Sequence, residues 1–280
     1  MHFGFISQPM TNIQFLKMHG LGNDFVIIDN RKHMLNLSPS QIRAVSNRKR
    51  GIGCDQLITM EASKTNADIK MRIYNSDGSE VGACGNAARC IGHLMMDEKN
   101  NTQIKIETMD RILLATRSNE LISVNMGQAA IDWRDIPLSQ KMDTISLEIN
   151  EGILENPVAV NVGNPHMVFF VKNINGIDLE SIGPKLEHHS LFPNKANIEI
   201  AQIISSEKIR VRVWERGAGI TEACGSGACA VLVAAVRRNL SDRRAKIELD
   251  GGTLEIEWQR DNCVSMTGPT EINFSGSFSL

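Results

Sequence analysis

Two short stretches of the chain place a cysteine in nearly the same surroundings: "EVGACGNAARC" (Glu80–Cys90) and "ITEACGSGACA" (Ile220–Ala230). Each contains Ala-Cys-Gly, then a small polar residue, then an alanine-rich run. The two cysteines, Cys84 and Cys224, are separated by half the length of the 280-residue chain. A cysteine that recurs in one context at this spacing indicates an internal duplication.

Other segments keep this spacing of 140 residues to within one residue. The matched pairs are "GNDFVII" with "GNPHMVF", "IKMRIYN" with "IRVRVWE", "KIE" at 105–107 with "KIE" at 246–248, Gln56 with Asn197, and Gly127 with Gly268. A coincidence of small-residue motifs is the alternative, because short matches alone are weak signals. A register kept across six matches, counting the cysteine context, favours two homologous halves, which we predict to be domains over residues 12–128 and 129–268.

The composition is typical of a globular protein without a strong charge. The formal net charge of −2 argues against nucleic acid or an anionic membrane surface as a partner. No stretch approaches the roughly 20 apolar residues that span a bilayer. The first residues lack the pattern of a secretory signal. We predict that residues 1–11 form a flexible extension and that the folded sequence begins near Asn12. Six cysteines are too few for a disulfide scaffold, which favours a cytoplasmic protein with reduced thiols.

Both halves show the same coarse pattern of strands and one apolar helix. Runs with a period of two, rich in Val and Ile, predict strands at "FVIID", "IKMRIYN", "LISVNM", "PVAVNV", "MVFFV", "KIRVRVW" and "TLEIEW". Each cysteine then precedes a helix, over residues 86–96 and 228–236, and the second is apolar on every face, as a buried helix must be. This predicts an α+β fold of two domains, each a curled, barrel-like mixed or antiparallel sheet around a central helix.

The cysteines are expected to lie at helix N-termini, where unpaired backbone N–H groups and the helix dipole favour anions. A thiol in that position is expected to have a lowered pKa. Gly85 and Gly225 carry no side chain, so a ligand carboxylate can approach the backbone N–H groups closely. The spacing of the cysteines does not fit a structural zinc site, and we interpret the other four as small core residues: Cys54, Cys90, Cys229 and Cys263.

Duplicated domains often pack about a pseudo-twofold axis, which would direct Cys84 and Cys224 at one ligand in the cleft from opposite sides. Two opposed acid–base groups around one carbon are what inversion of a stereocentre requires. Two helix N-termini would also stabilise negative charge that develops on a carboxylate. The sequence thus predicts racemisation or epimerisation next to a carboxylate, with no metal and no cofactor.

The motifs resemble those of the diaminopimelate epimerase family, from about residue 12 to residue 268. They are "HGLGNDF", "GIGCDQ", "YNSDGSEVGACGNAARC", "VGNPH", "NIEIAQ" and "ERGAGITEACGSGACA". The resemblance implies a cofactor-independent isomerase that interconverts L,L- and meso-diaminopimelate for lysine and peptidoglycan precursor synthesis, and a homodimer. It also implies that the tail, 269–280, returns to the first domain as a strand.

The resemblance assigns roles to individual residues. Cys84 and Cys224 match the paired catalytic acid and base, and His166 and Glu215 match residues that tune the thiols. Arg216, together with Glu215, matches the pair that meets the charged ends of the substrate, and a guanidinium can grip a carboxylate with two hydrogen bonds. The remaining substrate-binding positions are Asn23, Gln56, Asn75, Gly85, Asn86, Asn164, Asn197, Gly225 and Ser226.

Several alternatives remain at this stage. Local turn chemistry is the other interpretation of His166 and of the asparagines. The chain departs from the family pattern at Ala87 and Ile220, which commonly are Gly and Glu, so a changed substrate preference is possible. A proline or hydroxyproline racemase-like enzyme shares the two-thiol logic. A non-catalytic ligand-binding relative or a thiol redox protein on the same scaffold is the alternative from another class.

Overall fold

The computed structural model describes residues 12–32, 35–82 and 84–279. The predicted flexible extension, 1–11, therefore lies outside the described residues. The described part of the first half contains β1 (Asn12–Gly20), β2 (Asn23–Asp29), α1 (Pro39–Ser46), β3 (Gln56–Glu61), β4 (Ile69–Asn75), β5 (Glu80–Val81), α2 (Gly85–Lys99), β6 (Gln103–Glu107), β7 (Ile112–Ser118) and β8 (Leu121–Gln128).

The second half contains β9 (Asn150–Glu151), β10 (Leu154–Glu155), β11 (Val158–Asn161), β12 (Pro165–Phe170), a 3-10 helix (Ile174–Gly176), α3 (Leu179–Glu187), β13 (Asn197–Ser205), β14 (Lys208–Glu215), β15 (Gly219–Thr221), α4 (Gly225–Arg237), β16 (Arg244–Leu249), β17 (Gly252–Trp258) and β18 (Cys263–Gly268). The chain ends with β19 (Glu271–Ser279). All seven strands predicted from the sequence are present, so that prediction is confirmed. The protein is a mixed fold of helices and strands, and most of it is sheet.

Strand pairing follows the same order in both halves. In the first half, β2 pairs with β3 in parallel, β3 with β4 antiparallel, and β4 with β6 in parallel. In the second half, β12 pairs with β13 in parallel, β13 with β14 antiparallel, and β14 with β16 in parallel. The residue pairs Phe25–Gln56 and His166–Asn197 occupy corresponding positions in these ladders. The repeat in the sequence is therefore also a repeat of hydrogen-bonded topology.

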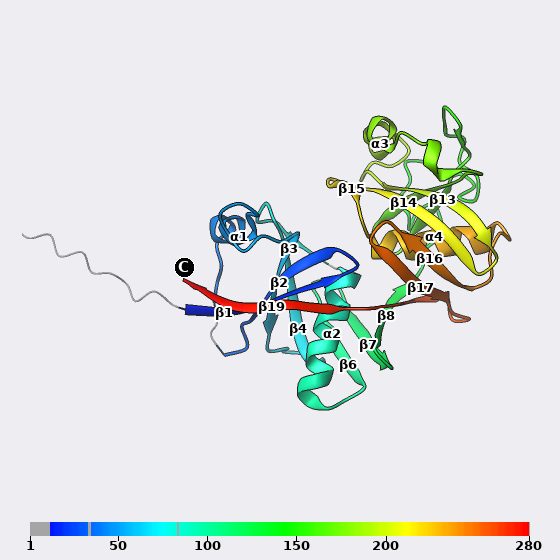
Figure 1. Cartoon of the computed structure of the whole chain (residues 1–280). Coiled ribbons are helices and arrows are strands. Elements are labelled where there is room, and N and C mark those ends of the chain that lie inside the picture. The colour runs from blue at the N-terminus through cyan, green and yellow to red at the C-terminus, as the bar shows by residue number, and fades with distance from the viewer. Residues whose placement is uncertain (1–11, 33–34, 83, 280) are drawn as a thin grey trace, which may run out of the picture.

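One buried helix lies within each half (Figure 1). Helix α2 packs against β1, β6, β7 and β8, and α4 packs against strands that include β11, β16 and β17. The residues of α4 from Ala228 to Ala235 are all buried, as the continuous apolar pattern predicts. Both helices begin directly after their cysteine, and α4 ends at Arg237, where a cation suits the negative end of the helix dipole.

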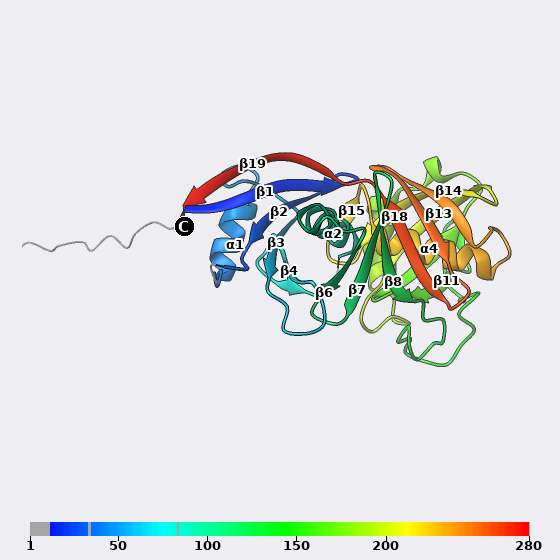
Figure 2. The ribbon, with the colours of Figure 1, turned by 90° about the horizontal axis from the view of Figure 1, so that it is seen from below.

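The sheets of the two halves are joined. Strand β8 of the first half pairs antiparallel with β18 of the second, and this pairing contributes to one 17-stranded sheet. After β18 the chain returns, and β19 runs antiparallel to β1, beside it in both views (Figures 1 and 2). The largest cluster of buried apolar side chains includes residues from both halves, among them Met126 and Met266. The connection therefore brings the two cysteine-bearing helices against one shared core.

Candidate active site

Cys84 is the N-cap residue of α2 and is partly buried. Its thiol lies 3.8 Å from the side-chain oxygen of Asn23, which can accept the S–H hydrogen bond. The same oxygen accepts a hydrogen bond of 3.3 Å from the side-chain amide of Asn86. Cys84 therefore faces an acceptor that is contributed by β2.

Cys224 is the N-cap residue of α4 and has 4% of its surface exposed. Its sulfur accepts a hydrogen bond of 3.3 Å from the backbone N–H of Gly227 and lies 3.5 Å from the Ser226 hydroxyl. The charge of the Glu215 carboxyl group also acts on this thiol. The two cysteines thus occupy equivalent positions in the repeat but have different partners.

The first turns of the two helices touch. The side-chain amide of Asn86 donates a hydrogen bond of 3.4 Å to the backbone carbonyl of Ala223, the residue before Cys224. A Cβ atom on Gly225 would lie 3.2 Å from the side-chain oxygen of Asn86. Within the described residues, the structure therefore places both cysteine loops side by side, as the facing of the two halves requires.

The space that a side chain at either glycine would need is occupied by Met266 of β18. A Cβ atom on Gly85 would lie 2.5 Å from the methyl carbon of Met266, and one on Gly225 would lie 2.8 Å from its sulfur. The absence of side chains at both positions therefore matters for packing. The glycines let the two helix ends approach each other and β18, because any larger residue would clash there.

The pKa values of the two thiols are raised, whereas the sequence predicted a lowered value. Burial raises the pKa of the Cys84 thiol to about 11, and the carboxyl group of Glu215 adds to this effect. Burial, with Glu215 and Glu199, raises the pKa of Cys224 well above its usual value. The backbone N–H groups at the helix ends act in the opposite direction but do not prevail, because loss of solvent penalises the charged form more strongly. Both thiols are therefore protonated in the ligand-free site at neutral pH.

Behind Cys224, His166 is fully buried between two polar side chains. Its Nδ1 lies 2.6 Å from Glu199, whose side chain is also fully buried, and its Nε2 lies 2.8 Å from the side-chain oxygen of Asn164. Glu199 lies in the motif "NIEIAQ" but was not among the site residues predicted from the sequence. A carboxylate between apolar residues of a strand with period two is the signal that could have found it, because such a buried charge needs a partner.

Glu215 lies close enough to both thiols for its charge to raise both of their pKa values. Its carboxyl group accepts a hydrogen bond of 2.5 Å from the Thr221 hydroxyl, and burial raises its own pKa. The next residue, Arg216, is exposed, and its guanidinium donates to the backbone carbonyl of Asn194 at 2.8 Å. The predicted pair of residues for the charged ends of a substrate therefore has one partly buried and one exposed member.

The amide residues fall into two groups. In the first half, Gln56 donates to Asn75 at 3.1 Å, and Asn75 donates to the Ser79 hydroxyl at 3.2 Å. These hydrogen bonds connect side chains where β3 begins and β4 ends. In the second half, Asn197 donates to the backbone carbonyl of Pro165 at 3.0 Å and accepts from the backbone N–H of Arg216 at 2.9 Å. Both ends of the Asn197 amide are therefore engaged by the backbone, and it holds two loops together.

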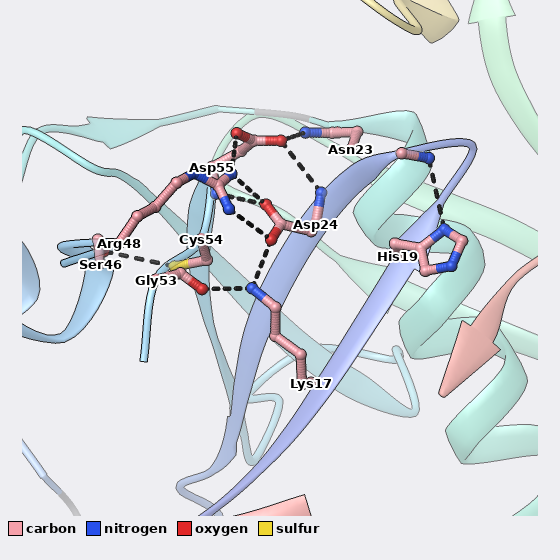
Figure 3. Close-up of polar contacts among 10 residues, drawn as sticks. Lys17, His19, Asn23, Asp24, Ser46, Arg48, Gly53, Cys54 and Asp55 are labelled. Atoms are coloured by element: carbon pink, nitrogen blue, oxygen red, sulfur yellow. Dashed lines mark hydrogen bonds and ion pairs between the residues drawn. The ribbon is translucent and has the colours of Figure 1, made fainter. Parts of the chain in front are cut away.

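Asn23 is held by charged residues of the first half (Figure 3). Its side-chain amide donates a hydrogen bond of 3.0 Å to the carboxylate of Asp55. Asp55, in the motif "GIGCDQ", was not among the site residues predicted from the sequence. It directly precedes β3, and the pairing of β2 with β3 brings it next to Asn23.

Arg89 is a third residue near the thiols that was not predicted from the sequence. It lies in α2, has 0% of its surface exposed, and its Nη1 contacts the sulfur of Met266 at 3.4 Å. Its Nε and Nη2 have no hydrogen-bond partner among the described residues. A buried guanidinium without a carboxylate is unusual, because removing a charge from water is costly. Its field acts on Cys84, where it favours the thiolate.

The remaining cysteines and the two departures from the family pattern lie at different depths in the structure. Cys54, Cys90 and Cys229 are buried, as expected, whereas Cys263 is only partly buried because it begins a strand near the surface. All six cysteines are free thiols. Ala87 is fully buried in the first turn of α2, and Ile220 is exposed on β15.

The described residues also bear on metal binding and on membrane insertion. No group of three or more His, Cys, Asp or Glu residues there could hold a metal ion. None of the helices in this part of the chain is long and apolar enough to cross a membrane.

Comparison with known proteins identifies the family. The model of the family described as diaminopimelate epimerase matches residues 15–131 and 158–272. The chain belongs to the diaminopimelate epimerase family. The diaminopimelate epimerase of Rhodospirillum centenum is 50% identical over 268 residues, which cover 95% of this chain and 92% of that protein. The diaminopimelate epimerase of Acidiphilium cryptum is 50% identical over 263 residues, or 94% and 95% of the two chains. The family resemblance predicted from the sequence is confirmed.

Solved structures share the fold of this diaminopimelate epimerase family member at low sequence identity. A phenazine biosynthesis protein of the PhzF family from Bacillus anthracis has a TM-score of 0.70 at 16% identity, over 97% of this chain and all of the other. A hydroxyproline epimerase from Agrobacterium vitis has a TM-score of 0.69 at 12% identity, over 96% and 93% of the two chains. At these identities the likeness concerns the fold alone.

Proposed function

We propose that this protein is an isomerase that interconverts L,L- and meso-diaminopimelate in lysine biosynthesis, with Cys84 and Cys224 as its paired acid and base. Family membership supports the reaction. The observation that carries the assignment of the thiols is that both cap a buried helix and that the two helix ends touch through Asn86 and Ala223.

The reaction exchanges one proton for another at a single carbon. One cysteine, as thiolate, takes the α-proton, so the C–H bond breaks and its electron pair moves toward the carboxylate. The other cysteine, as thiol, donates its proton to the opposite face of the carbon. One thiolate and one thiol enter the step and one of each leaves it, so the reverse reaction uses the same groups with their roles exchanged.

Substrate binding must generate the thiolate, because both thiols have a raised pKa in the ligand-free site. The α-ammonium group of the amino acid brings a positive charge beside the sulfur atoms, and a nearby opposite charge favours the ionised form. The buried guanidinium of Arg89 acts in the same direction. Binding and deprotonation are therefore coupled.

The N-terminal ends of α2 and α4 stabilise the charge that develops. Their first backbone N–H groups have no partners within the helix, and the helix dipole adds a partial positive charge. A substrate carboxylate at this junction gains most from these groups when it carries the electron pair of the broken C–H bond. Gly85, Asn86, Gly225 and Ser226 form the two first turns, which makes them the proposed carboxylate site.

The distal end of diaminopimelate also carries one ammonium and one carboxylate group. We assign Arg216, which is exposed and always charged, to the distal carboxylate. Asn23, Gln56, Asn75, Asn164 and Asn197 supply the oxygen and N–H groups around the substrate or hold the loops that do so. His166 and Glu215 set the local charge next to Cys224.

Exchange of solvent hydrogen into diaminopimelate tests this function. The protein, dialysed against a chelator and free of pyridoxal phosphate, is incubated with L,L-diaminopimelate in deuterium oxide. We expect meso product with one deuterium at the inverted carbon. A requirement for an added cofactor, or racemisation of proline with no action on diaminopimelate, contradicts the proposal. Binding of diaminopimelate without any exchange would favour the non-catalytic alternative.

The finer architecture is part of the same proposal. We infer two homologous domains over residues 12–128 and 129–268, each a curled sheet around its helix, with the active site in the cleft between them and the tail 269–280 added to the first. The pairing of β19 with β1 and the repeated strand order support this division. We also propose a cytoplasmic homodimer, which light scattering coupled to gel filtration can test.

A further inference from the structure

A network of charged side chains lies directly behind Asn23 (Figure 3). Asp24 and Asp55 are joined reciprocally, because the backbone N–H of Asp55 donates to Asp24 at 2.8 Å and that of Asp24 donates to Asp55 at 3.1 Å. Arg48 donates to both carboxylates at 2.7 Å, and Lys17 donates to Asp24 at 2.5 Å. Two cations and two backbone amides therefore hold both carboxylates in place.

The network is partly removed from water: Lys17 is buried and Asp24 half-buried, whereas Arg48 and Asp55 are exposed. Lys17 has 7% of its surface exposed and also donates to the backbone carbonyl of Gly53. Burial acts against ionisation of Asp24, yet hydrogen bonds from Arg48 and Lys17 hold the pKa of this carboxyl group below its usual value. The network ties β1 and β2 to the loop before β3, and nothing in the proposed chemistry uses it.

The position of Asp55 determines which way the amide of Asn23 can face. The NH2 group of Asn23 donates to Asp55 at 3.0 Å, and its oxygen lies 3.3 Å from the NH2 group of Asn86 and 3.8 Å from the Cys84 thiol. An ionised carboxylate only accepts hydrogen bonds. A flipped amide would therefore set its oxygen against the Asp55 carboxylate and its NH2 group against that of Asn86.

We propose that Asp55 is a positioning residue, which fixes the side-chain amide of Asn23 so that the oxygen, and not the NH2 group, faces the Cys84 thiol. The inference rests on the proposed role of Cys84 as an acid and base. An oxygen in this position accepts the S–H proton and favours the thiol, whereas an NH2 group would favour the thiolate. Asp55 thereby keeps Cys84 protonated before the substrate arrives.

Two other charges act on the Cys84 thiol and must stay constant in any test. Glu215, from β14, raises its pKa, and Arg89, from its own helix, lowers it. Neither forms a hydrogen bond with Asp55 or Asn23 in the described structure. A substitution at Asp55 therefore changes the surroundings of Cys84 chiefly through Asn23.

The test measures the pH dependence of Cys84 alkylation in the ligand-free full chain. Iodoacetamide reacts with the thiolate, and mass spectrometry of the peptide that contains Cys84 gives its rate separately from the other cysteines. With Asp55→Asn, the position 55 side chain can donate as well as accept, so the Asn23 amide is free to flip. We expect the midpoint to fall by about one pH unit, which is about tenfold more thiolate at a given pH.

Asp68→Asn is a matched control. Asp68 likewise accepts a backbone N–H, from Lys105 at 2.8 Å, and a cation, Lys99 at 2.7 Å. Lys99 is at the last turn of the 15-residue helix α2, about 20 Å from Cys84 at 1.5 Å per residue. We expect no shift in this variant. A Cys84 midpoint that stays unchanged in folded Asp55→Asn, or that shifts equally in Asp68→Asn, overturns the proposal.

A double variant covers the case in which Asp55→Asn does not fold. In Asn23→Asp/Asp55→Asn the two groups are exchanged, so the amide at position 55 donates to a carboxylate at position 23, and an oxygen still faces Cys84. We expect a midpoint at or above that of the wild-type protein, and a lower midpoint contradicts the proposal. The alkylation readout needs no turnover, so deuterium exchange into diaminopimelate tests the proposed function independently.

Discussion

The side-chain amide of Asn86 donates a hydrogen bond to the backbone carbonyl of Ala223, 137 residues further along the chain. The contact joins the first turn of one buried helix to the residue before the cysteine of the other. It brings together the ends of α2 and α4, which are the parts of each half that carry a thiol. The reactivity of both thiols is expected to depend on this junction and on the charges around it.

Replacement of either cysteine at the junction is expected to abolish epimerisation. In Cys84→Ala or Cys224→Ala, one face of the carbon has no proton donor or acceptor, and a positioned acid or base contributes typically 10²–10⁴-fold. The serine variants are expected to retain a trace of activity. Product formation is measured by chiral chromatography, with Cys90→Ala as the control for a buried thiol outside the site. Near-normal turnover by Cys84→Ala would refute the two-thiol mechanism.

Two of the core thiols, Cys90 and Cys229, are expected to make the protein less stable at alkaline pH. Burial raises the pKa of Cys90 and of Cys229 to about 12, whereas a cysteine thiol in the unfolded chain has a pKa of about 8.5. Between these values the unfolded chain loses protons that the folded chain keeps. The free energy of unfolding therefore falls with rising pH, by up to about 1.4 kcal/mol per pH unit for each thiol.

Urea unfolding between pH 8 and 11 measures this slope. Cys90→Ala and Cys229→Ala should each make the slope shallower, whatever they do to stability at neutral pH. Cys263→Ala, at a partly exposed position, should change it less. An identical slope in all four proteins would show that these thiols titrate alike in the folded and unfolded chain.

The buried pair His166–Glu199 is expected to matter for both stability and rate. In Glu199→Gln the imidazole loses the carboxylate at 2.6 Å, and breaking a buried pair typically costs about 3–5 kcal/mol. Turnover should fall as well, because Glu199 and His166 shape the charge around Cys224 and Glu215. Denaturant unfolding and kcat are measured on the same samples.

The double variant His166→Gln/Glu199→Gln separates the two effects. Its amides can pair with each other without a buried charge, so stability should recover in part while kcat stays low. Recovery of both quantities would mean that the pair only holds the fold.

Arg89→Met is expected to stabilise the protein and to lower its kcat. The variant removes a fully buried guanidinium that lacks a carboxylate partner among the described residues, and apolar replacement of buried charges can add about 1–4 kcal/mol. It also removes a charge that favours the Cys84 thiolate. We expect a higher Tm, a lower kcat and an activity profile shifted to higher pH. Arg89→Lys, which keeps the charge, should retain more activity, and equal loss in both variants would indicate a packing role.

Oxidation is expected to join Cys84 and Cys224 and to inactivate the protein. Both are free thiols at touching helix ends, and a thiolate is the attacking species in disulfide exchange. Because both pKa values are raised, inactivation should be slow near pH 7 and faster above pH 9. A dithiol reductant should restore activity, and bound diaminopimelate should protect. Peptide mapping of the inactive protein decides: another linkage, or free thiols at both positions, contradicts the prediction.

The sequence by itself determined the local elements and their repetition. Apolar alternation in "IKMRIYN" and "KIRVRVW" specifies strands, and the apolar run after Cys224 specifies a buried helix, because these patterns act over a few residues. The recurrence of Ala-Cys-Gly at half the chain length indicated that both helices belong to one duplicated unit. The family was predicted from the motifs and their order along the chain, while the roles of the two thiols and of the substrate-binding residues stay predictions.

Only the tertiary structure decided the charges around the thiols. Glu199, Arg89 and Asp55 meet their neighbours across strands and between halves, and no local pattern reports such contacts. The thiol pKa shows the consequence most clearly. A cysteine at a helix N-terminus suggests a lowered value, but burial and nearby carboxylates raise it at Cys84 and Cys224. Desolvation depends on everything packed around a group, so it is fixed only when the whole chain has folded.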